Sequence, residues 1–336
     1  MRVPSTIKSF RLGVQPVRSS SRGFTLLELL IALTIGLVIL SAGMAVYLSA
    51  GRASQVSQYE TQLNEDGILA LNLIQAQIKQ AGYSEQIIPN SGATVTGNFY
   101  GIAIRGCDGG FSDDAVAFAS LACATGAGSD SIAVRYQATV YNTYPTIGPP
   151  PAPTNCIGNG ISTTTPSQVS PVPSTAPEKY ALADNRYSVK SSGGQPTLVC
   201  RGIQNSAVSP PTGDIQPLLA NVEEMQLRYG VASRPSLELA SSYDPMRHQI
   251  INYLTASEID ALPTTGTQPN ITDDRWGRVL SVRVCLLMRS DLPVPDTPPG
   301  GLTYKTCDNV DATSTDGHLR RTYTTTILLR NRLIIP

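Results

Sequence analysis

The chain has 336 residues, of which 41% are hydrophobic and 15% charged, with 25 basic and 25 acidic side chains. This length can bury a substantial core, and the low charge with many Gly, Pro, Ser and Thr residues is typical of an exported, loop-rich protein. The formal net charge is zero and no basic cluster is interleaved with aromatic residues, so nucleic acid is not expected as a partner.

The first 23 residues, "MRVPSTIKSFRLGVQPVRSSSRG", form a basic leader. They contain five Lys or Arg and no Asp or Glu, and an apolar stretch follows from Phe24 to about Ala50. A basic segment before an apolar one is an export and orientation signal whose positive end stays in the cytoplasm. We therefore expect a leader at 1–23 and a membrane-spanning segment at 24–50.

The apolar stretch is too long for the core of an ordinary secretory signal. From Leu29 to Ala50 there are 22 residues without a charge. At roughly 1.5 Å per residue they span about 33 Å, which is enough to cross a bilayer core of about 30 Å. Taken alone, this pattern also fits a plain membrane anchor.

The junction "RGFTLLE", residues 22–28, carries a more specific pattern than the apolar stretch alone. It has a basic residue and Gly at the end of the leader, then Phe first, Thr second and Glu fifth in the apolar segment. It resembles the class III signal of type IV prepilins and pseudopilins. The resemblance implies that a prepilin peptidase cuts between Gly23 and Phe24 on the cytoplasmic side and methylates the new amine of Phe24. The apolar segment would remain in the mature protein.

Glu28 is an acidic residue inside the apolar segment. A carboxylate within a bilayer costs about 2.5 to 3.5 kcal/mol at its centre, so this residue needs a partner. The resemblance implies that Glu28 pairs with the N-terminal amine of a neighbouring subunit during assembly. That pair would set the axial register of a filament, since a mis-stepped neighbour leaves both charges unpaired. The alternative is that Glu28 reaches the lipid headgroups.

The segment 51–82 predicts a continuation of the same helix with one buried face. Gly82 fits a helix C-cap, so a single helix is expected from Phe24 to about Ala81. The apolar positions at spacings of three and four are Val56, Tyr59, Leu63, Ala70, Ile74 and Ile78.

The remainder, 83–336, predicts β structure. Alternating apolar residues indicate strands within 130–140, 225–231, 276–290 and 322–335. No strand–helix alternation occurs, so we expect an α+β fold in which an antiparallel sheet packs on the long helix. Between these strands, residues 144–177 contain nine prolines, which exclude a helix or a central strand and indicate a surface insert.

Six cysteines lie in this C-terminal part, and none forms a CxxC pair. Their even number without metal-ligand spacing favours disulfides and an oxidising compartment such as the periplasm. Six cysteines allow fifteen connectivities. Proximity in sequence favours the pairs Cys107–Cys123, Cys285–Cys307 and, across the insert, Cys156–Cys200.

Catalytic motifs are absent from the sequence. His248 and His318 lie in segments without a nucleophile elbow or HExxH pattern, and there is no Gly-rich phosphate loop. We therefore expect no enzymatic activity and no cofactor.

Two acidic runs are the only candidates for a metal. Some pseudopilins bind calcium through loop carboxylates, but neither run has EF-hand spacing, and solvated loop carboxylates are the simpler interpretation. The residues are Asp108, Asp113 and Asp114 in the first run, and the calcium candidates Asp308, Asp311 and Asp316 in the second.

Several further phrases resemble the PilW family of type IV pilus minor pilins: "IKQAGY", "SIAVRY", "NVEEMQLRYGV", "WGRVLSVRVCLLMRS" and "RRTYTTTILLRNR". The resemblance implies a minor pilin that primes pilus assembly near the filament tip. It would reside in the inner membrane of a Gram-negative bacterium with its globular part in the periplasm, and later in the pilus.

The partners that this resemblance implies are the other minor pilins, the major pilin, the prepilin peptidase, the assembly machinery and a tip adhesin. Because the extreme tip subunit usually lacks the acid, Glu28 indicates a place beneath it. Two alternatives remain open. One is a minor pseudopilin of a type II secretion system, and the other is an adhesive or ligand-binding module displayed through residues 144–177 or 232–275.

Overall fold

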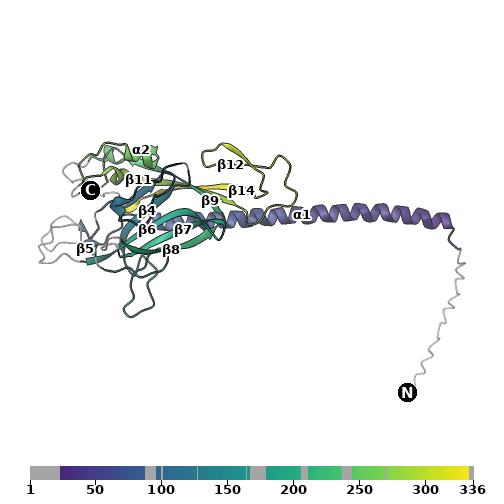
Figure 1. Cartoon of the computed structure of the whole chain (residues 1–336), viewed down its shortest axis with the longest axis horizontal. Coiled ribbons are helices and arrows are strands. Elements are labelled where there is room, and N and C mark those ends of the chain that lie inside the picture. The colour runs from purple at the N-terminus through teal and green to yellow at the C-terminus, as the bar shows by residue number, and fades with distance from the viewer. Residues whose placement is uncertain are drawn as a thin grey trace, which may run out of the picture. The chain divides into compact units, whose positions relative to one another are not determined.

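The structure is a computed structural model (Figure 1), and it describes residues 23–87, 96–99, 101–126, 128–163, 165–166, 179–205, 211–236, 244–268 and 271–332. The chain divides into two compact units, one ending at Ser54 and the other beginning at Gln55. The first unit holds the apolar part of the N-terminal helix, and the second holds the rest of that helix and all the strands.

Helix α1 spans Leu26–Ile78, 53 residues, slightly shorter at both ends than the predicted helix. Its buried residues are Leu63, Gly67, Ala70, Ile74 and Ile78, whereas the predicted Val56 and Tyr59 are only half-buried. Gly82 ends the segment with φ at 76°, a conformation that glycine adopts readily, and its N–H donates to the Arg135 carbonyl at 2.9 Å.

The strands form two larger sheets, and every pairing is antiparallel. The order in one is β3-β4-β6-β7-β8, with β5 paired to β6, and in the other β10-β9-β11-β14. The first contains β3 (Ile104–Cys107), β4 (Ser131–Ala138), β5 (Thr165–Pro166), β6 (Lys179–Ser192), β7 (Gln195–Asn205) and β8 (Thr212–Ala220). The second contains β9 (Val222–Ala232), β10 (Ile250–Leu254), β11 (Val279–Arg289) and β14 (Arg320–Leu328).

Smaller elements complete the fold. Two two-stranded sheets are formed by β1 (Gln86–Ile87) with β2 (Thr96–Gly97) and by β12 (Leu302–Lys305) with β13 (Asp311–Ser314). The short helices are η1 (Phe118–Ser120), η3 (Pro245–His248), α2 (Ala256–Asp260), η4 (Arg275–Arg278) and η5 (Arg330–Arg332).

The α+β prediction is confirmed, and the four predicted strands correspond to β4, β9, β11 and β14. The strands divide between two sheets, a division that the sequence pattern did not specify. In the first of these sheets, the centre of β6 is buried on both faces although it carries Asp184, Asn185 and Arg186. The Arg186 guanidinium donates to both carboxylate oxygens of Asp184 at 2.9 and 2.7 Å. A sequence pattern cannot anticipate that such polar residues satisfy one another inside a core.

The second half of α1 packs against strands of both sheets. Tyr136 of β4 donates its hydroxyl to Gln77 at 3.3 Å, and Tyr323 of β14 donates its hydroxyl to Asn64 at 2.8 Å. A Cβ on Gly67 would lie 2.4 Å from the Tyr323 ring, so glycine permits the close approach of α1 to β14. The buried face of α1 therefore lies on the joint core of the two sheets.

The "WGR" stretch, residues 276–278, links the region after β9 to the core. Trp276 packs edge-on against Tyr229 with ring centroids 5.0 Å apart, and its indole N–H donates to Asp260 of α2 at 2.8 Å. Arg278 donates to the carbonyl of Ala232 at 3.0 Å. The described part of 232–275, one of the two ranges considered above for a displayed binding surface, is thus folded against β9 through η3, β10 and α2.

The six cysteines form Cys107–Cys123, Cys156–Cys200 and Cys285–Cys307, the pairs that proximity in sequence favours. The second disulfide attaches the proline-rich insert to β7. Within the insert, Thr154 and Gly160 form an isolated bridge, while residues 164 and 167–178 lie outside the described part of the chain.

Candidate processing and assembly site

The predicted cleavage junction lies immediately before α1. Residues 23–25 are not helical, and Phe24 is 86% exposed. Apart from its chain neighbours, no atom of the described residues comes within 4 Å of the position that a Cβ on Gly23 would occupy. Within the described part of the chain, the junction of Gly23 and Phe24 is therefore uncovered. The leader residues 1–22 lie outside the described residues.

Glu28 and Thr25 cap the start of α1 reciprocally. The Glu28 N–H donates to Thr25 Oγ1 at 3.2 Å, and the Thr25 N–H donates to Glu28 Oε2 at 3.4 Å. This S/T-x-x-E arrangement is a capping box, and a carboxylate in the first turn is favoured by the helix dipole. The carboxylate thus lies at the helix end that follows the cleavage junction. The prediction for Glu28 did not include Thr25, although the spacing "TLLE" signals it.

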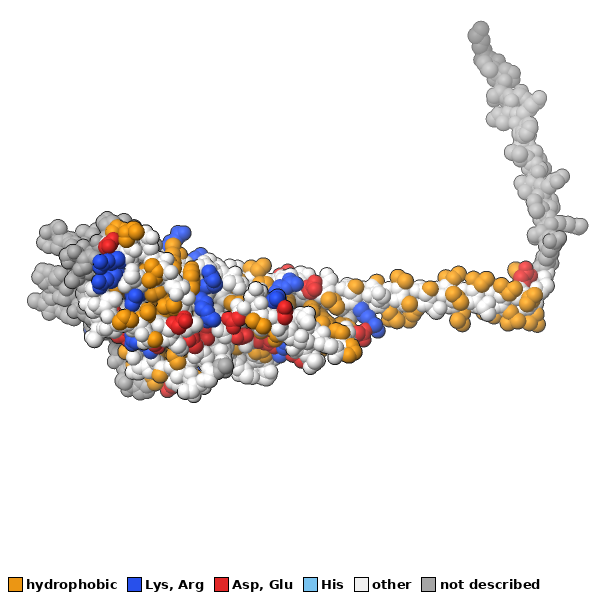
Figure 2. All heavy atoms as spheres, turned by 90° about the horizontal axis from the view of Figure 1, so that it is seen from above, with side chains coloured by type: hydrophobic (Ala, Val, Ile, Leu, Met, Phe, Trp, Pro, Cys, Tyr) orange, Lys and Arg blue, Asp and Glu red, His pale blue; other side chains and the backbone are white. Residues whose placement is uncertain are grey.

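The first half of α1 has no cover. It is the single helix among the described residues that is long and apolar enough to cross a membrane, with mean hydropathy 2.5 and none of the apolar window buried. Large side chains such as Leu37, at 70% exposed, lie open along it, and Figure 2 shows hydrophobic side chains along this part of the helix. Such a surface requires lipid or other apolar helices around it.

The second half of α1 also keeps apolar residues uncovered. Ile68, Leu69 and Leu73 are 57%, 47% and 37% exposed, at helix positions that flank the buried face or lie opposite to it. Like the first half, this side of the helix is a candidate contact surface for another subunit.

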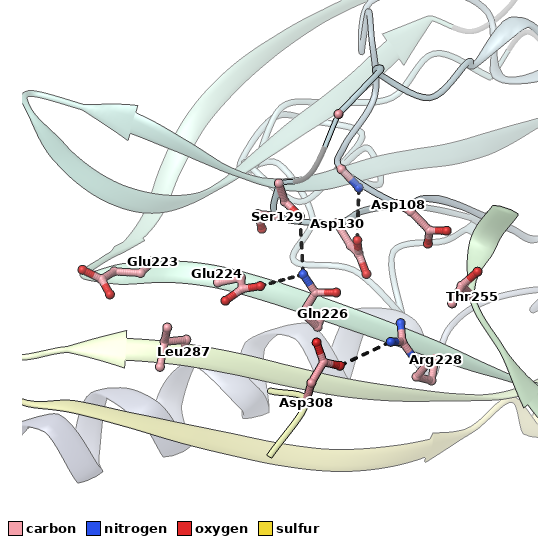
Figure 3. Close-up of a pocket in the computed structure, with 13 residues that line it drawn as sticks. Asp108, Ser129, Asp130, Glu223, Glu224, Gln226, Arg228, Thr255, Leu287 and Asp308 are labelled. Atoms are coloured by element: carbon pink, nitrogen blue, oxygen red, sulfur yellow. Dashed lines mark hydrogen bonds and ion pairs between the residues drawn. The ribbon is translucent and has the colours of Figure 1, made fainter. Parts of the chain in front are cut away.

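The globular unit contains an acidic cleft of about 780 Å³ (Figure 3). It lies between the loop before β4, strand β9 and the β12–β13 turn. Its lining residues are Asp108, Gly109, Gly126, Gly128, Ser129, Asp130, Glu223, Glu224, Gln226, Arg228, Thr255, Leu287 and Asp308. The structure therefore brings Asp108 and Asp308, one from each acidic run, to the same cleft.

The carboxylates of the cleft are engaged by groups of the protein itself. Asp130 accepts N–H groups from Gly109 at 3.2 Å and from Leu227 at 2.7 Å, and burial raises the pKa of Asp130 to about 6. Burial also acts to raise the pKa of Asp108, but hydrogen bonds from Ser257 and from the Ala256 N–H outweigh it and lower this pKa. Both residues hold loops and strands together, which is a structural role.

The three calcium candidates do not converge. Asp308 lies 3.4 Å from Arg228, Asp311 lies 2.8 Å from Lys305, and Asp316 lies 2.6 Å from Arg320. Each carboxylate therefore has its own cationic neighbour. Among the described residues no group of three or more His, Cys, Asp or Glu is placed to hold a metal ion. The geometry does not fit a shared calcium ion at these three residues.

The two histidines have separate surroundings in the fold. His248 ends η3, whereas His318 Nδ1 lies 2.8 Å from the carbonyl oxygen of Ser290. The residues predicted for processing and assembly, Gly23, Phe24 and Glu28, are instead adjacent at one helix end.

Comparison with known proteins is consistent with this arrangement. Residues 186–331 match a family described as type IV pilus-assembly protein W, and residues 18–44 match the prokaryotic N-terminal methylation motif. No curated protein matches the sequence. Among solved structures, a type IV-like pilin from Thermus thermophilus is similar with a TM-score of 0.34 and 12% identity, over 81% of this chain and 97% of that chain.

Proposed function

We propose that the protein is a minor pilin that primes pilus assembly near the filament tip, because residues 186–331 match the family described as type IV pilus-assembly protein W and residues 18–44 match the N-terminal methylation motif. The observation that supports this most directly is the start of α1. An accessible Gly23–Phe24 junction, the Glu28 carboxylate and an uncovered apolar helix follow one another there.

Each of these features has a part in the proposed assembly. Prepilin peptidase cleaves after Gly23 and methylates the amine of Phe24, so that the chain keeps its apolar helix. Before assembly, the subunit resides in the inner membrane of a Gram-negative cell with its disulfide-bonded unit in the periplasm. The cationic amine of a neighbouring subunit then pairs with Glu28, and the uncovered apolar surface of α1 passes from lipid into contact with other pilins.

The proposed partners follow from the same steps. They are the prepilin peptidase, the inner-membrane assembly machinery, other minor pilins, the major pilin and an adhesin at the tip. Because Glu28 is present, the proposed position is below the first subunit and not at the extreme tip. The family is structural, and the protein acts here as a subunit.

The test is the amount of filament sheared from cells that lack this gene, compared with the same cells carrying the intact gene. Loss of filaments with recovery on complementation is the expected result. Unchanged filaments together with a defect in secreted proteins would instead assign the chain to a type II secretion filament. Unchanged filaments and unchanged secretion would exclude both assembly roles.

A displayed binding role has one observation in its favour. On the loop after β4, Tyr141, Tyr144 and Ile147 are 93%, 91% and 105% exposed. The loop is nonetheless held in place, because Asn142 accepts the Thr139 N–H at 2.7 Å and Thr154 donates to the Tyr144 carbonyl at 2.5 Å. Aromatic side chains presented rigidly in this way are typical of contact surfaces.

We expect the double change Tyr141→Ser and Tyr144→Ser to reduce attachment of cells to a surface while leaving the number of sheared filaments unchanged. The measurements are a cell-attachment assay and filament quantification on the same cultures. The change Ile215→Ser, an exposed apolar residue on β8, is the matched control. Attachment equal to that of the unaltered strain would remove this second function.

A further inference from the structure

Strand β14 leaves one open edge of the four-stranded sheet. It is the last strand in the order β10-β9-β11-β14, and it pairs with β11 over nine consecutive positions without a register shift. It contains no proline, and its stretch from Thr322 to Thr326 is free of charge. A long, regular edge of this kind is a template for another strand.

The other edges of the two larger sheets are blocked or short. Strand β8 contains Pro217, and its pairing with β7 shifts register twice. Strand β10 has five residues and a register shift, and β3 has four residues and is tied to α2 by the ion pair of Arg105 with Asp260 at 3.7 Å. Bulges, proline and cover are the usual protections of an edge. Among the described strands of these sheets, β14 lacks them.

The groups that face outward from β14 follow from its register. The Leu329 N–H donates to the Leu280 carbonyl at 2.8 Å, and antiparallel strands alternate between bonded and unbonded pairs. The odd-numbered residues of β14 therefore bond to β11. The backbone N–H and C=O groups of Thr324, Thr326 and Leu328 point to the open edge, and all three residues are exposed. No described strand pairs with this side of β14.

Helix α1 presents an exposed apolar residue beside this edge. Asn64 of α1 accepts hydrogen bonds from Arg321 at 2.6 Å and from the Tyr323 hydroxyl at 2.8 Å, so this flank of the helix lies next to β14. Ile68 is one helical turn further along the same flank and is 57% exposed. One more strand beside β14 would cover Ile68, which the sheet as it stands leaves open to solvent.

We propose that the β14 edge binds an extended segment of a different protein chain, which adds a fifth strand to this sheet. Alternate residues of that segment face α1 and are apolar, since they would cover Ile68. Backbone hydrogen bonds to Thr324, Thr326 and Leu328 supply the remaining contacts. A segment of about 5 to 6 residues, an ordinary strand length, is sufficient.

A second copy of this chain does not suit the edge. Antiparallel pairing of two β14 strands across a twofold axis would also make residues 55–78 of the two α1 helices antiparallel, so the N-terminal ends of these helix parts would point in opposite directions although both chains start from the same membrane. Parallel pairing across a twofold axis along the strands would place the two helices on opposite faces and leave Ile68 uncovered. The occupant is therefore a different chain, which in the proposed function is another subunit of the tip complex.

The first experiment places a photo-crosslinking amino acid, p-benzoylphenylalanine, at residue 324 or 328 of the full-length protein in cells. The same amino acid at residue 215 on the blocked edge β8 is the control. Crosslinks from 324 and 328 to one short segment of a single other chain, with little from 215, are expected. Crosslinks to this chain itself or to a second copy, or none in cells that assemble filaments, would overturn the proposal.

The second experiment deletes an outward hydrogen-bonding group of β14 and keeps the pairing of β14 with β11. Thr326→Pro deletes an outward N–H and keeps the bonds to β11, so the melting temperature should stay the same while the crosslink yield from residue 324 falls about tenfold. Thr325→Pro, which deletes a bond to β11, should lower the melting temperature instead. If Thr326→Pro fails to fold, Thr326→Lys places an edge-protecting charge at the same position and should reduce the yield similarly.

The two proposals can fail separately. Retained crosslinking in a stable Thr326→Pro protein would refute strand addition, whatever the number of filaments. Crosslinking that is lost in this variant, in cells whose filament number does not depend on the gene, would refute the priming role and leave the strand site intact.

Discussion

At the scale of single residues, the proposed processing places Gly23 directly before the bond that is cut. A side chain at this position would then have to fit a peptidase that accepts glycine. We expect Gly23→Leu to leave the leader attached, because the added side chain blocks the protease and not because the helix changes. Immunoblotting or intact mass of the membrane-bound protein measures this directly.

The control for that experiment is Gly51→Leu, which lies within α1, where no atom comes within 4 Å of the added Cβ position. It should be processed normally. A Gly23→Leu protein that also loses its leader at the normal rate would contradict the cleavage site.

One substitution can separate the observed capping role of Glu28 from its proposed pairing role. The capping box needs only an acceptor at this position, and glutamine serves as well as glutamate there. The proposed ion pair with a neighbouring amine needs the charge. We therefore expect Glu28→Gln to insert in the membrane with an intact helix start but to enter filaments far less than the unaltered protein.

Glu28→Ala should add a modest loss of helix stability of about 0.5 to 2 kcal/mol, typical of a lost cap. Immunoblots of sheared filaments and of membranes measure both variants. Normal incorporation of Glu28→Gln would show that capping alone explains the residue.

At the scale of elements, the contact of α1 with β14 depends on the missing side chain of Gly67. A Cβ there would overlap the Tyr323 ring, and the bond of its hydroxyl to Asn64 at 2.8 Å opposes any movement of the ring. Gly67→Ala should therefore destabilise the globular unit by about 1 to 3 kcal/mol, as overpacking does, despite the better helix propensity of alanine.

Trp276 reports on this unfolding, because it is the single tryptophan and is 3% exposed. Its fluorescence during urea titration of the detergent-solubilised protein gives the free energy of unfolding. Gly51→Ala is the matched control, since its Cβ meets nothing and should leave the midpoint unchanged or slightly raised. Equal midpoints for Gly67→Ala and Gly51→Ala would show that the ring moves aside.

For the whole molecule, Asp130 sets the pH dependence of stability near neutrality. Burial raises its pKa to about 6, above the unfolded value of about 3.9, so the folded state binds this proton more tightly than the unfolded state. Asp108 and Arg228 are the charged neighbours, and their effects on this pKa oppose each other. Stability should therefore rise as pH falls from about 7 through 6, by at most about 3 kcal/mol.

Other carboxylates act in the opposite direction at lower pH. Asp114 lies beside Lys190 and Arg201, and Asp273 accepts hydrogen bonds from Arg275. Despite their partial burial, these neighbours lower both pKa values. The stability that they contribute is present above the unfolded value of about 3.9 and is lost as pH falls through their lower folded values. The globular unit should thus be most stable between about pH 4 and 6.

Urea midpoints measured by Trp276 fluorescence at pH 4.5, 6.0 and 7.5 test this profile. Asp130→Asn should remove the rise in stability between pH 7.5 and 4.5, because the neutral amide does not titrate. The same rise in Asp130→Asn as in the unaltered protein would assign it to another group.

The sequence by itself determined the features that depend on neighbours along the chain. Residues 22–28 lie in the segment that matches the N-terminal methylation motif, the apolar run predicts the helix that is long enough to span a membrane, and the spacing of Leu63, Ala70 and Ile74 predicts the buried face of α1. The alternation of apolar residues also predicted strands β4, β9, β11 and β14. Residues on one face recur with a period of two in a strand and 3.6 in a helix, so a local pattern shows them. Proximity in sequence also favoured the disulfide pairs that the structure contains.

Only the tertiary structure decided the features that depend on contacts between distant segments. Strand β6 is a buried central strand although it carries Asp184 and Arg186, because the Arg186 guanidinium also donates to the carbonyl groups of Asp114 and Val116 in a distant segment. The meeting of Asp108 with Asp308 in one cleft, the separation of the calcium candidates and the open edge of β14 have the same origin. Burial and pairing arise from long-range packing, which has no period in the sequence, so no local pattern could have shown them.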